Sequence, residues 1–192
     1  MNRIARRGGR IYLRRALRSD RDEVLRLNRA SLRFYRGLVM PPLTARGWSA
    51  YLARRTRSNS QGYLVCRASD GVIVGGININ EIVRGAFCSG YLGYQIGAPH
   101  ARRGYMTEAL ALVLRQAFGP LRLHRVEANI QPGNRASIAL VRRAGFRREG
   151  LSRRYLKIGG RWRDHERWAL TVEDWRRRVR RQGRRSGVRP SA

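Results

Sequence analysis

The sequence predicts an α/β domain built on a mixed β-sheet, and two patterns in the chain indicate this fold class. Strand-like and helix-like segments alternate through the middle of the chain, at residues 87–97, 106–118, 125–130 and 134–144. Hairpin patterns flank this central part on both sides, at residues 62–80 and 151–171. Hairpins give antiparallel pairs and alternating elements favour parallel ones, so the sheet should contain both, with helices packed on it.

The first third of the chain should supply one strand and two helices. Residues 10–17 fit a strand, and Ser19-Asp20 provides an N-cap for a helix that runs to about residue 32. Residues 34–43 contain two consecutive prolines and should form a loop. Thr44 then caps a second helix.

The next part should form three strands and the central helix. Residues 62–68 and 72–80 flank Asp70-Gly71, a dipeptide typical of hairpin turns. Residues 87–97 show the alternation of a third strand. From Met106 the apolar residues recur at helical spacing, and a Gly-Pro pair ends this helix after residue 118.

The last part should add a strand, a helix and a final hairpin. The expected elements are a strand at residues 125–130, a helix that Asn134 caps and Gly145 ends, and a hairpin of residues 151–158 and 162–171. We expect one domain over residues 1–175. Residues 176–192 should form a basic tail that is helical at first and then disordered.

The charge balance restricts the classes of partner. The 192 residues include 42 Lys+Arg and 12 Asp+Glu, which gives a formal net charge of +30. Such a surface favours polyanions such as RNA, in a salt-dependent way. A compositional bias of the source genome explains the same arginine content without any nucleic acid, so both interpretations stay open.

Several other classes of protein find no support. There is no run of about 18 apolar residues, and the N-terminus lacks the apolar segment of a secretory signal, so we expect a cytoplasmic protein without a membrane span. Cys66 and Cys88 lie far apart in predicted strands and should be free, buried thiols. No His/Cys cluster has the spacing of metal ligands, so we predict no metal.

The most informative stretch is the loop of residues 101–106, which joins a strand to a helix. Gly104 permits a backbone conformation closed to other residues, and the unpaired amides of a helix N-terminus follow it. With Arg102 and Arg103 beside it, the loop suits a phosphate or pyrophosphate, although a solvated surface turn has the same pattern. A Walker A loop is absent, since the only lysine is Lys157, and so is a dinucleotide fingerprint.

Three motifs resemble those of the GNAT superfamily of acetyl-CoA-dependent N-acetyltransferases. They are Arg102-Arg103-Gly104-Tyr105-Met106, Asn134-Arg135-Ala136-Ser137 and Ala144-Gly145-Phe146. The segments Leu92-Gly93-Tyr94, Tyr155-Leu156 and Trp162-Arg163-Asp164-His165 are similar to the Rim-type ribosomal-protein-alanine N-acetyltransferases. The resemblance implies a single GNAT-like domain, with a mixed, mostly antiparallel central sheet, splayed central strands and flanking helices.

The resemblance also implies acetyl-CoA as the coenzyme. The pyrophosphate would lie on the loop amides, and the pantetheine arm would add itself along the strand edge. The implied contacts are Tyr94, Gln95, Ile96, Arg102, Arg103, Gly104, Tyr105, Met106, Thr107, Asn134 and Ser137. Ala101 departs from the family's usual Gln or Arg, which removes one side-chain contact.

Acetyl transfer needs a proton donor for the leaving thiolate and a neutral amine. Many GNAT members place a tyrosine where this chain has Val141, and the Rim-type resemblance suggests Ser137 as its replacement. Glu127 and Glu81 are candidates for a general base, but either could instead be the partner of an arginine. Since an α-amino group titrates near about 8 and a lysine near about 10.4, a protein N-terminus is the more natural acceptor without a committed base.

Five residues are candidates for binding the acceptor, namely Tyr35, Trp48, Tyr155, Asp164 and His165. Packing on the sheet would also explain the first two. The expected activity is acetylation of a protein N-terminus, on a ribosomal protein by resemblance, through direct attack in a ternary complex. Two alternatives stay open: transfer to a small-molecule amine such as a polyamine, and a ribosome- or RNA-binding protein on a GNAT scaffold. The sequence does not indicate an oligomeric state.

Overall fold

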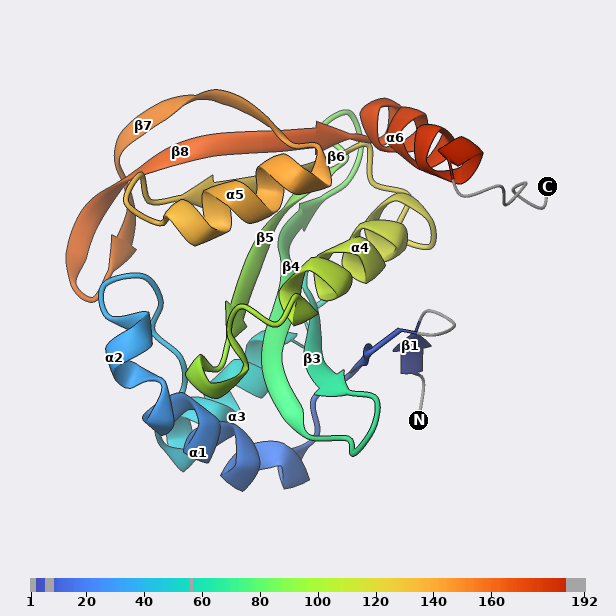
Figure 1. The fold of residues 1–192 in the computed structure, drawn as a ribbon. Coiled ribbons are helices and arrows are strands. Elements are labelled where there is room, and N and C mark those ends of the chain that lie inside the picture. The colour runs from blue at the N-terminus through green and yellow to red at the C-terminus, as the bar shows by residue number, and fades with distance from the viewer. Residues whose placement is uncertain (1–2, 6–8, 56, 186–192) are drawn as a thin grey trace.

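The computed structural model describes residues 3–5, 9–55 and 57–185 and shows an eight-stranded sheet with helices on both faces (Figure 1). The strands are β1 (Arg3–Ala5), β2 (Ile11–Arg14), β3 (Gln61–Arg67), β4 (Ile73–Val83), β5 (Ser89–Ile96), β6 (Arg125–Ile130), β7 (Arg147–Ile158) and β8 (Arg161–Thr171). Their order in the sheet is β1-β2-β3-β4-β5-β6-β8-β7. β5 and β6 are parallel and the other neighbours are antiparallel, so the predicted fold class and the mixed sheet are confirmed.

The helices divide between the two faces of the sheet. They are α1 (Arg21–Ala30), α2 (Leu32–Tyr35), α3 (Ala45–Arg55), α4 (Tyr105–Phe118), α5 (Arg135–Ala144) and α6 (Val172–Arg185), with short 3-10 turns at Arg18–Asp20 and Ala98–His100. Successive side chains of β3 point to opposite faces of the sheet. Val65 belongs to the larger core under α4 and α5, whereas Leu64 and Cys66 belong to a smaller core with α1 and α3.

The sheet opens between β5 and β6. Pairing between these strands ends at Tyr91, whereas β4 follows β5 as far as Ile96. Gly97 N donates to Val74 O of β4 at 2.9 Å, and alternate residues of a strand direct their backbone groups to opposite sides. Tyr94 and Ile96 therefore direct their N–H and C=O groups away from β4, and β5 has a free edge beyond Tyr91. The predicted splay of the central strands is confirmed.

Several caps and turns form as the local sequence predicts. Gly47 N donates to Thr44 Oγ1 at 3.1 Å where α3 begins, and Ser137 N donates to Asn134 Oδ1 at 3.1 Å where α5 begins. Gly145 follows α5 in the left-handed conformation, with φ 98°. Each of these features involves residues close together in the chain, which is why the sequence alone predicts them.

The N-terminal strand and the cap that follows it differ from the prediction. β2 ends at Arg14 rather than at residue 17, and Asp20 does not cap α1 with its side chain. Its carboxylate instead accepts from Leu17 N and from both terminal nitrogens of Arg14, each at 2.7 Å. Arg14 and Asp20 are both buried, so an ion pair inside the fold takes the place of the predicted cap.

The helix predicted to run to about residue 32 is interrupted at Ser31. The Ser31 hydroxyl donates to Leu27 O at 2.7 Å and accepts from Ala98 N at 2.9 Å. Phe34 and Tyr35, predicted to start a loop, lie in α2 instead. The predicted boundaries were wrong because the contact of Ser31 with Ala98, in the distant segment after β5, fixes the position of the break. Local helix propensity gives no information about such a contact.

The two ends of the chain compare differently with the prediction. β1 was not predicted, whereas α6 continues past residue 175, which agrees with the predicted tail that is helical at first. Residues 186–192 of the predicted tail lie outside the described residues, so the domain division stays a prediction. Cys66 is buried in β3, but Cys88 is half-buried in the turn before β5 rather than in a strand. In the described ranges, no helix combines the length and apolar character that a bilayer crossing requires.

Candidate functional site

The N-terminus of α4 presents backbone amides beside a basic loop. Gly104 has φ +81° and Arg102 has φ +60°, so the loop turns through two left-handed residues. Thr107 N and Glu108 N donate to Gly104 O, at 3.0 and 3.2 Å, and no side chain caps the helix. The amides that precede them have no acceptor within the helix, and with the positive end of the helix dipole they suit an anionic group.

Arg10 contacts this helix end as the ion-pair partner of Glu108. Its backbone N and its Nε donate to the Glu108 carboxylate, at 2.9 and 2.6 Å, and its guanidinium lies 5.6 Å from the centre of the Tyr105 ring. A Cβ atom at Gly104 would come within 2.8 Å of Arg10 Nη2, at the flexible end of that side chain, so the left-handed φ is what favours glycine here. Sequence reasoning missed Arg10 because 98 residues separate it from Glu108.

The free edge of β5 lies beside the N-terminus of α5. The Tyr94 hydroxyl is buried next to the Ser137 side chain, and among the described residues it has no hydrogen bond of normal geometry. Burial raises the pKa of Tyr94 to about 12, an effect that Ser137 offsets in part, so the phenol is neutral at pH 7. Val141 is fully buried in the core one turn beyond Ser137. Ser137 and Tyr94 therefore place two hydroxyl groups near the opening between β5 and β6.

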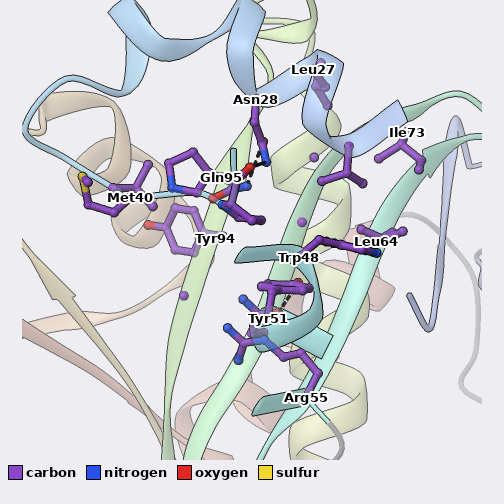
Figure 2. A pocket seen from close by; sticks show the side chains of 18 of the residues that line it. Leu27, Asn28, Met40, Trp48, Tyr51, Arg55, Leu64, Ile73, Tyr94 and Gln95 are labelled. Carbon is purple, nitrogen blue, oxygen red and sulfur yellow. Dashed lines mark hydrogen bonds between the residues drawn. The ribbon is translucent and has the colours of Figure 1, made fainter. Parts of the chain in front are cut away.

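A pocket of about 190 Å³ opens on the α1 and α3 face of the sheet, over β3, β4 and β5 (Figure 2). Trp48 and Tyr51 line it and stack with their ring centres 5.2 Å apart. Gly75, Gly76 and Gly93 line its sheet side, where the absence of side chains lets a ligand approach the backbone. The pocket therefore reaches β5 from one face, while the α5 terminus reaches it from the other.

The polar end of the pocket contains arginine and no carboxylate. Arg54 and Arg55 both line it, and none of the lining residues is Asp or Glu. Arg55 Nη1 donates to Ser60 Oγ at 3.2 Å and also to Asn80 Oδ1, and its guanidinium lies 4.9 Å from the centre of the Tyr51 ring. Arg55 is thus fixed in place, whereas the Arg54 side chain is exposed.

Gln95 lies in the pocket lining between β5 and α1. Its Nε2 donates to Asn28 Oδ1 at 3.3 Å, and Asn28 Nδ2 donates to Pro42 O at 2.9 Å (Figure 2). Because Asn28 is buried, these bonds fix the loop before α3 against α1 and β5. The Gln95 side chain therefore lies on the pocket face and its backbone groups point to β4, so its predicted contact with a coenzyme stays a prediction.

The two predicted general bases lie outside the pocket lining. Arg125 Nε donates to Glu127 Oε1 at 2.8 Å, so Glu127 is an arginine partner in this structure. Glu81 lies exposed near the end of β4 and accepts from Asn59 Nδ2 at 3.1 Å. An arginine partner was the alternative that the sequence left open for both carboxylates, and for Glu127 the structure shows it.

Comparison with known proteins identifies the family. Residues 10–147 match the family model described as the acetyltransferase (GNAT) domain. The chain belongs to the GNAT family. It is 38% identical over 133 residues to the [ribosomal protein uS5]-alanine N-acetyltransferase of Escherichia coli, which covers 67% of this chain and 69% of that protein. It is 36% identical over 124 residues to the probable N-acetyltransferase YjcK of Bacillus subtilis, with 65% and 68% covered.

A solved GNAT structure supports the same relation. Mycobacterium smegmatis RimJ, in complex with CoA-disulfide, superposes with a TM-score of 0.80 at 28% identity and covers 91% of this chain and 90% of its own. The predicted Rim-type relation and the class of N-acetyltransferase are confirmed. GNAT enzymes use acetyl-CoA, and the uncapped α4 terminus, the Gly104 turn and the free edge of β5 fit that coenzyme.

Of the acceptor contacts predicted for this GNAT domain, only Trp48 lines the pocket. Tyr35 is buried in α2 and is not part of the lining. Tyr155 and His165 lie on the β7–β8 hairpin, with ring centres 6.2 Å apart. Burial raises the pKa of Tyr91 on β5, and the nearby Tyr155 raises it further, so this hairpin lies close to β5.

Asp164 and His165 make contacts within the hairpin. Asp164 Oδ1 accepts from Arg154 N at 2.8 Å, next to an irregularity in the pairing of β7 with β8. His165 is buried, and its Nδ1 lies 2.9 Å from Arg163 O. Their predicted role in acceptor binding stays a prediction. Over the described ranges, no group of three or more His, Cys, Asp or Glu residues could hold a metal ion.

Proposed function

We propose that this GNAT enzyme transfers the acetyl group of acetyl-CoA to the N-terminal α-amine of a protein, with a ribosomal protein as the expected target. The acceptor amine attacks directly in a ternary complex, without a covalent acetyl-enzyme. The similarity to the uS5-alanine N-acetyltransferase supports the target class. The observation that carries the acceptor class is the pocket beside β5, which has no carboxylate in its lining.

The coenzyme part of the proposal rests on residues of three elements. The amides that follow Gly104 and the charges of Arg102 and Arg103 would hold the pyrophosphate. The free N–H and C=O groups of Tyr94 would pair with the pantetheine arm, as an added strand does. No metal takes part in this proposal.

The chain's own residues supply the rest of the chemistry. Acetyl-CoA brings the acetyl group as an activated thioester. Backbone N–H groups at the free edge of β5 can donate to the carbonyl oxygen as it gains negative charge, and such donors are normally the largest catalytic contribution. The Ser137 hydroxyl donates to the departing sulfur, since Val141 offers no proton at the site where many relatives have tyrosine.

A committed base is unnecessary for an α-amine. Such a group titrates near about 8, so about a tenth of it is neutral at pH 7, whereas a lysine is neutral in only about one molecule in two thousand. Glu127 is held by Arg125, which agrees with a mechanism that does not depend on that carboxylate. Polyamines are the less suitable acceptor, because a pocket for polycations needs acidic side chains and this lining has none.

The basic surface supports an encounter with a ribosome or with RNA. α6 exposes arginines that suit a phosphate backbone, at Arg176, Arg177, Arg178, Arg180 and Arg181. Asp174 pairs with Arg177 and Arg147 and is one of few carboxylates on this surface. The target would then be met on or near the ribosome, which agrees with the predicted cytoplasmic location.

The test is acetylation of a synthetic peptide that begins with alanine and contains one internal lysine. Mass spectrometry of fragments locates the acetyl group, and parallel reactions use the same peptide with a blocked N-terminus and a polyamine. We expect the acetyl group on the α-amine, and none on the blocked peptide. Acetylation of the lysine or the polyamine in preference would overturn the proposal.

A further inference from the structure

We propose that Arg54 and Arg55 make this pocket selective for N-terminal amines that are followed by neutral or acidic residues, and that their charge favours the uncharged, attacking form of the amine. The inference rests on the proposed function and deepens it, because it names the class of acceptor. It assigns a role to the side chains of α3, which neither the predicted motifs nor the predicted base include.

The position of the pocket relates it to the reacting centre. Gly93, Tyr94 and Gln95 of β5 line the pocket from one side. Tyr94 is also the residue whose backbone groups form the free edge and whose hydroxyl lies beside Ser137. An amine in the pocket is therefore one strand away from the proposed path of the thioester, and the two substrates meet at β5.

Charged and titratable side chains near the pocket lie on several of the elements around it. α3 provides Arg54 and Arg55, and the hydroxyl groups nearby are those of Tyr51, Tyr94 and, further along β5, Tyr91. Three carboxylates of neighbouring elements, outside the lining, are each engaged: Glu23 of α1 accepts from Ile73 N at 2.6 Å, Glu81 of β4 accepts from Asn59, and Glu127 of β6 accepts from Arg125. The charged groups that line the pocket are both positive.

The effect of these arginines is already visible on a group inside the pocket. Burial raises the pKa of the Tyr51 hydroxyl, and the positive charges of Arg55 and then Arg54 lower it in part, because they favour a negative phenolate. The same charges disfavour a positive ammonium group. An acceptor amine in the pocket should therefore lose its proton at a lower pH than in free solution.

The same charges act on the acceptor's next residues. Lysine or arginine close behind the N-terminus would meet two like charges, whereas glutamate or aspartate would meet opposite ones. Arg54 is the residue to change, because its side chain is exposed. Arg55 holds Ser60 and Asn80, so its replacement would alter the wall of the pocket as well as its charge.

The experiment compares wild type with Arg54→Glu on three peptides that begin with alanine and differ only at the second and third residues, as Glu-Glu, Gln-Gln or Lys-Lys. For wild type we expect kcat/KM to fall in that order, by roughly fivefold per step. Arg54→Glu should reverse the order. Arg46→Glu is the matched control, since Arg46 is exposed on the same helix about two turns away and outside the lining, and it should keep the wild-type order.

The pH dependence of kcat on the neutral peptide gives a second readout, because it reports the amine within the complex. In wild type its apparent pKa should lie below that of the free peptide, and in Arg54→Glu it should rise by about half a unit or more. The apparent pKa of Arg54→Gln should lie between those of wild type and Arg54→Glu. Arg54→Gln replaces Arg54→Glu in the experiment if the glutamate variant does not fold. An unchanged order and an unchanged apparent pKa in both variants would overturn the inference.

The design separates this inference from the proposed function. If wild type acetylates none of the three peptides although acetyl-CoA raises its melting temperature, the proposed acceptor is wrong and the charge inference is wrong with it. If all three peptides are acetylated equally, only the charge inference fails. If Arg46→Glu reverses the order as Arg54→Glu does, the general charge of the surface and not the pocket selects the acceptor, and the inference is overturned.

Discussion

Among single residues, Gly104 and Ser137 have the most direct consequences for activity. Gly104 allows the turn that brings the amides of α4 to the surface of the splay, at φ +81°. Ser137 makes two separate contacts: its backbone N–H donates to the Asn134 side chain, which caps α5, and its own side chain lies beside Tyr94. Substitutions at these positions test the coenzyme site and the proton donor separately.

Gly104→Val should abolish acetyl-CoA binding. A β-branched residue at a left-handed φ costs on the order of 1–3 kcal/mol, and its Cβ would also displace the Arg10 guanidinium. Calorimetric titration with acetyl-CoA measures the change. Gly133→Ala is the control, since a Cβ there meets no atom within 4 Å, and it should bind as wild type does. Retained affinity in Gly104→Val would contradict the loop assignment.

Ser137→Ala should lower kcat by roughly a hundredfold with little change in the dissociation constant of acetyl-CoA. The cap of α5 survives, because Asn134 Oδ1 accepts from the backbone N of Ser137 and not from its side chain. Steady-state rates and calorimetry together separate the two effects. A variant that turns over as fast as wild type would exclude Ser137 as the donor to sulfur.

Among the elements, the connection from β2 to α1 depends on one buried ion pair. Arg14 and Asp20 are each about 8% exposed, and the Asp20 carboxylate accepts three bonds. Because β2 pairs with β3 and residues of α1 line the pocket, this pair fixes one side of the pocket to the sheet.

Asp20→Ala should lower the free energy of unfolding by about 3 kcal/mol or more, because it leaves the Arg14 guanidinium buried without its partner. Asp22→Ala makes the same change two residues later, where the pair with Arg21 is exposed, and it should alter stability little. Urea unfolding of both variants measures the difference. Equal losses of unfolding free energy in the two variants would show that the buried Arg14–Asp20 pair contributes no more to stability than the exposed Arg21–Asp22 pair.

At the scale of the whole molecule, buried tyrosines make stability depend on alkaline pH. Burial raises the pKa of the hydroxyl groups of Tyr35, Tyr51, Tyr63, Tyr91 and Tyr94, and that of Tyr94 reaches about 12. The folded pKa of these groups lies above the unfolded value of about 10. Their contribution is therefore fully present below pH 10 and is lost as the pH rises toward 12.

The free energy of unfolding should thus show no tyrosine-dependent loss up to about pH 10 and then fall steeply. Denaturant midpoints between pH 8 and 12, with phenolate absorbance recorded on the same samples, measure it. Tyr94→Phe should retain more of its stability above pH 10 than wild type does. A decline that begins well below pH 9 would point to other groups and contradict this account.

Much of the fold follows from patterns within short stretches of the sequence. The strand alternation, the Asp70-Gly71 turn, the Asn134 cap and the Gly145 stop all formed where predicted, because each depends on residues a few positions apart. The boundaries near Arg14 and Ser31 were wrong, because contacts with Asp20 and Ala98 set them.

By itself, the sequence determined the α/β class, the resemblance to GNAT enzymes and the coenzyme loop, since Gly104 and the start of α4 are adjacent in the chain. Only the tertiary structure shows the pocket in which we propose that the acceptor binds. Packing brings α3 against β4 and β5, so Arg54 and Arg55 share a pocket with residues of both strands. It likewise places Arg10 on Glu108 and Glu127 on Arg125. Sequence spacing could not predict the pair of Arg10 with Glu108, because folding brings these distant residues together. Arg125 and Glu127 lie two residues apart on one strand face, and an arginine partner for Glu127 was an alternative that the sequence left open.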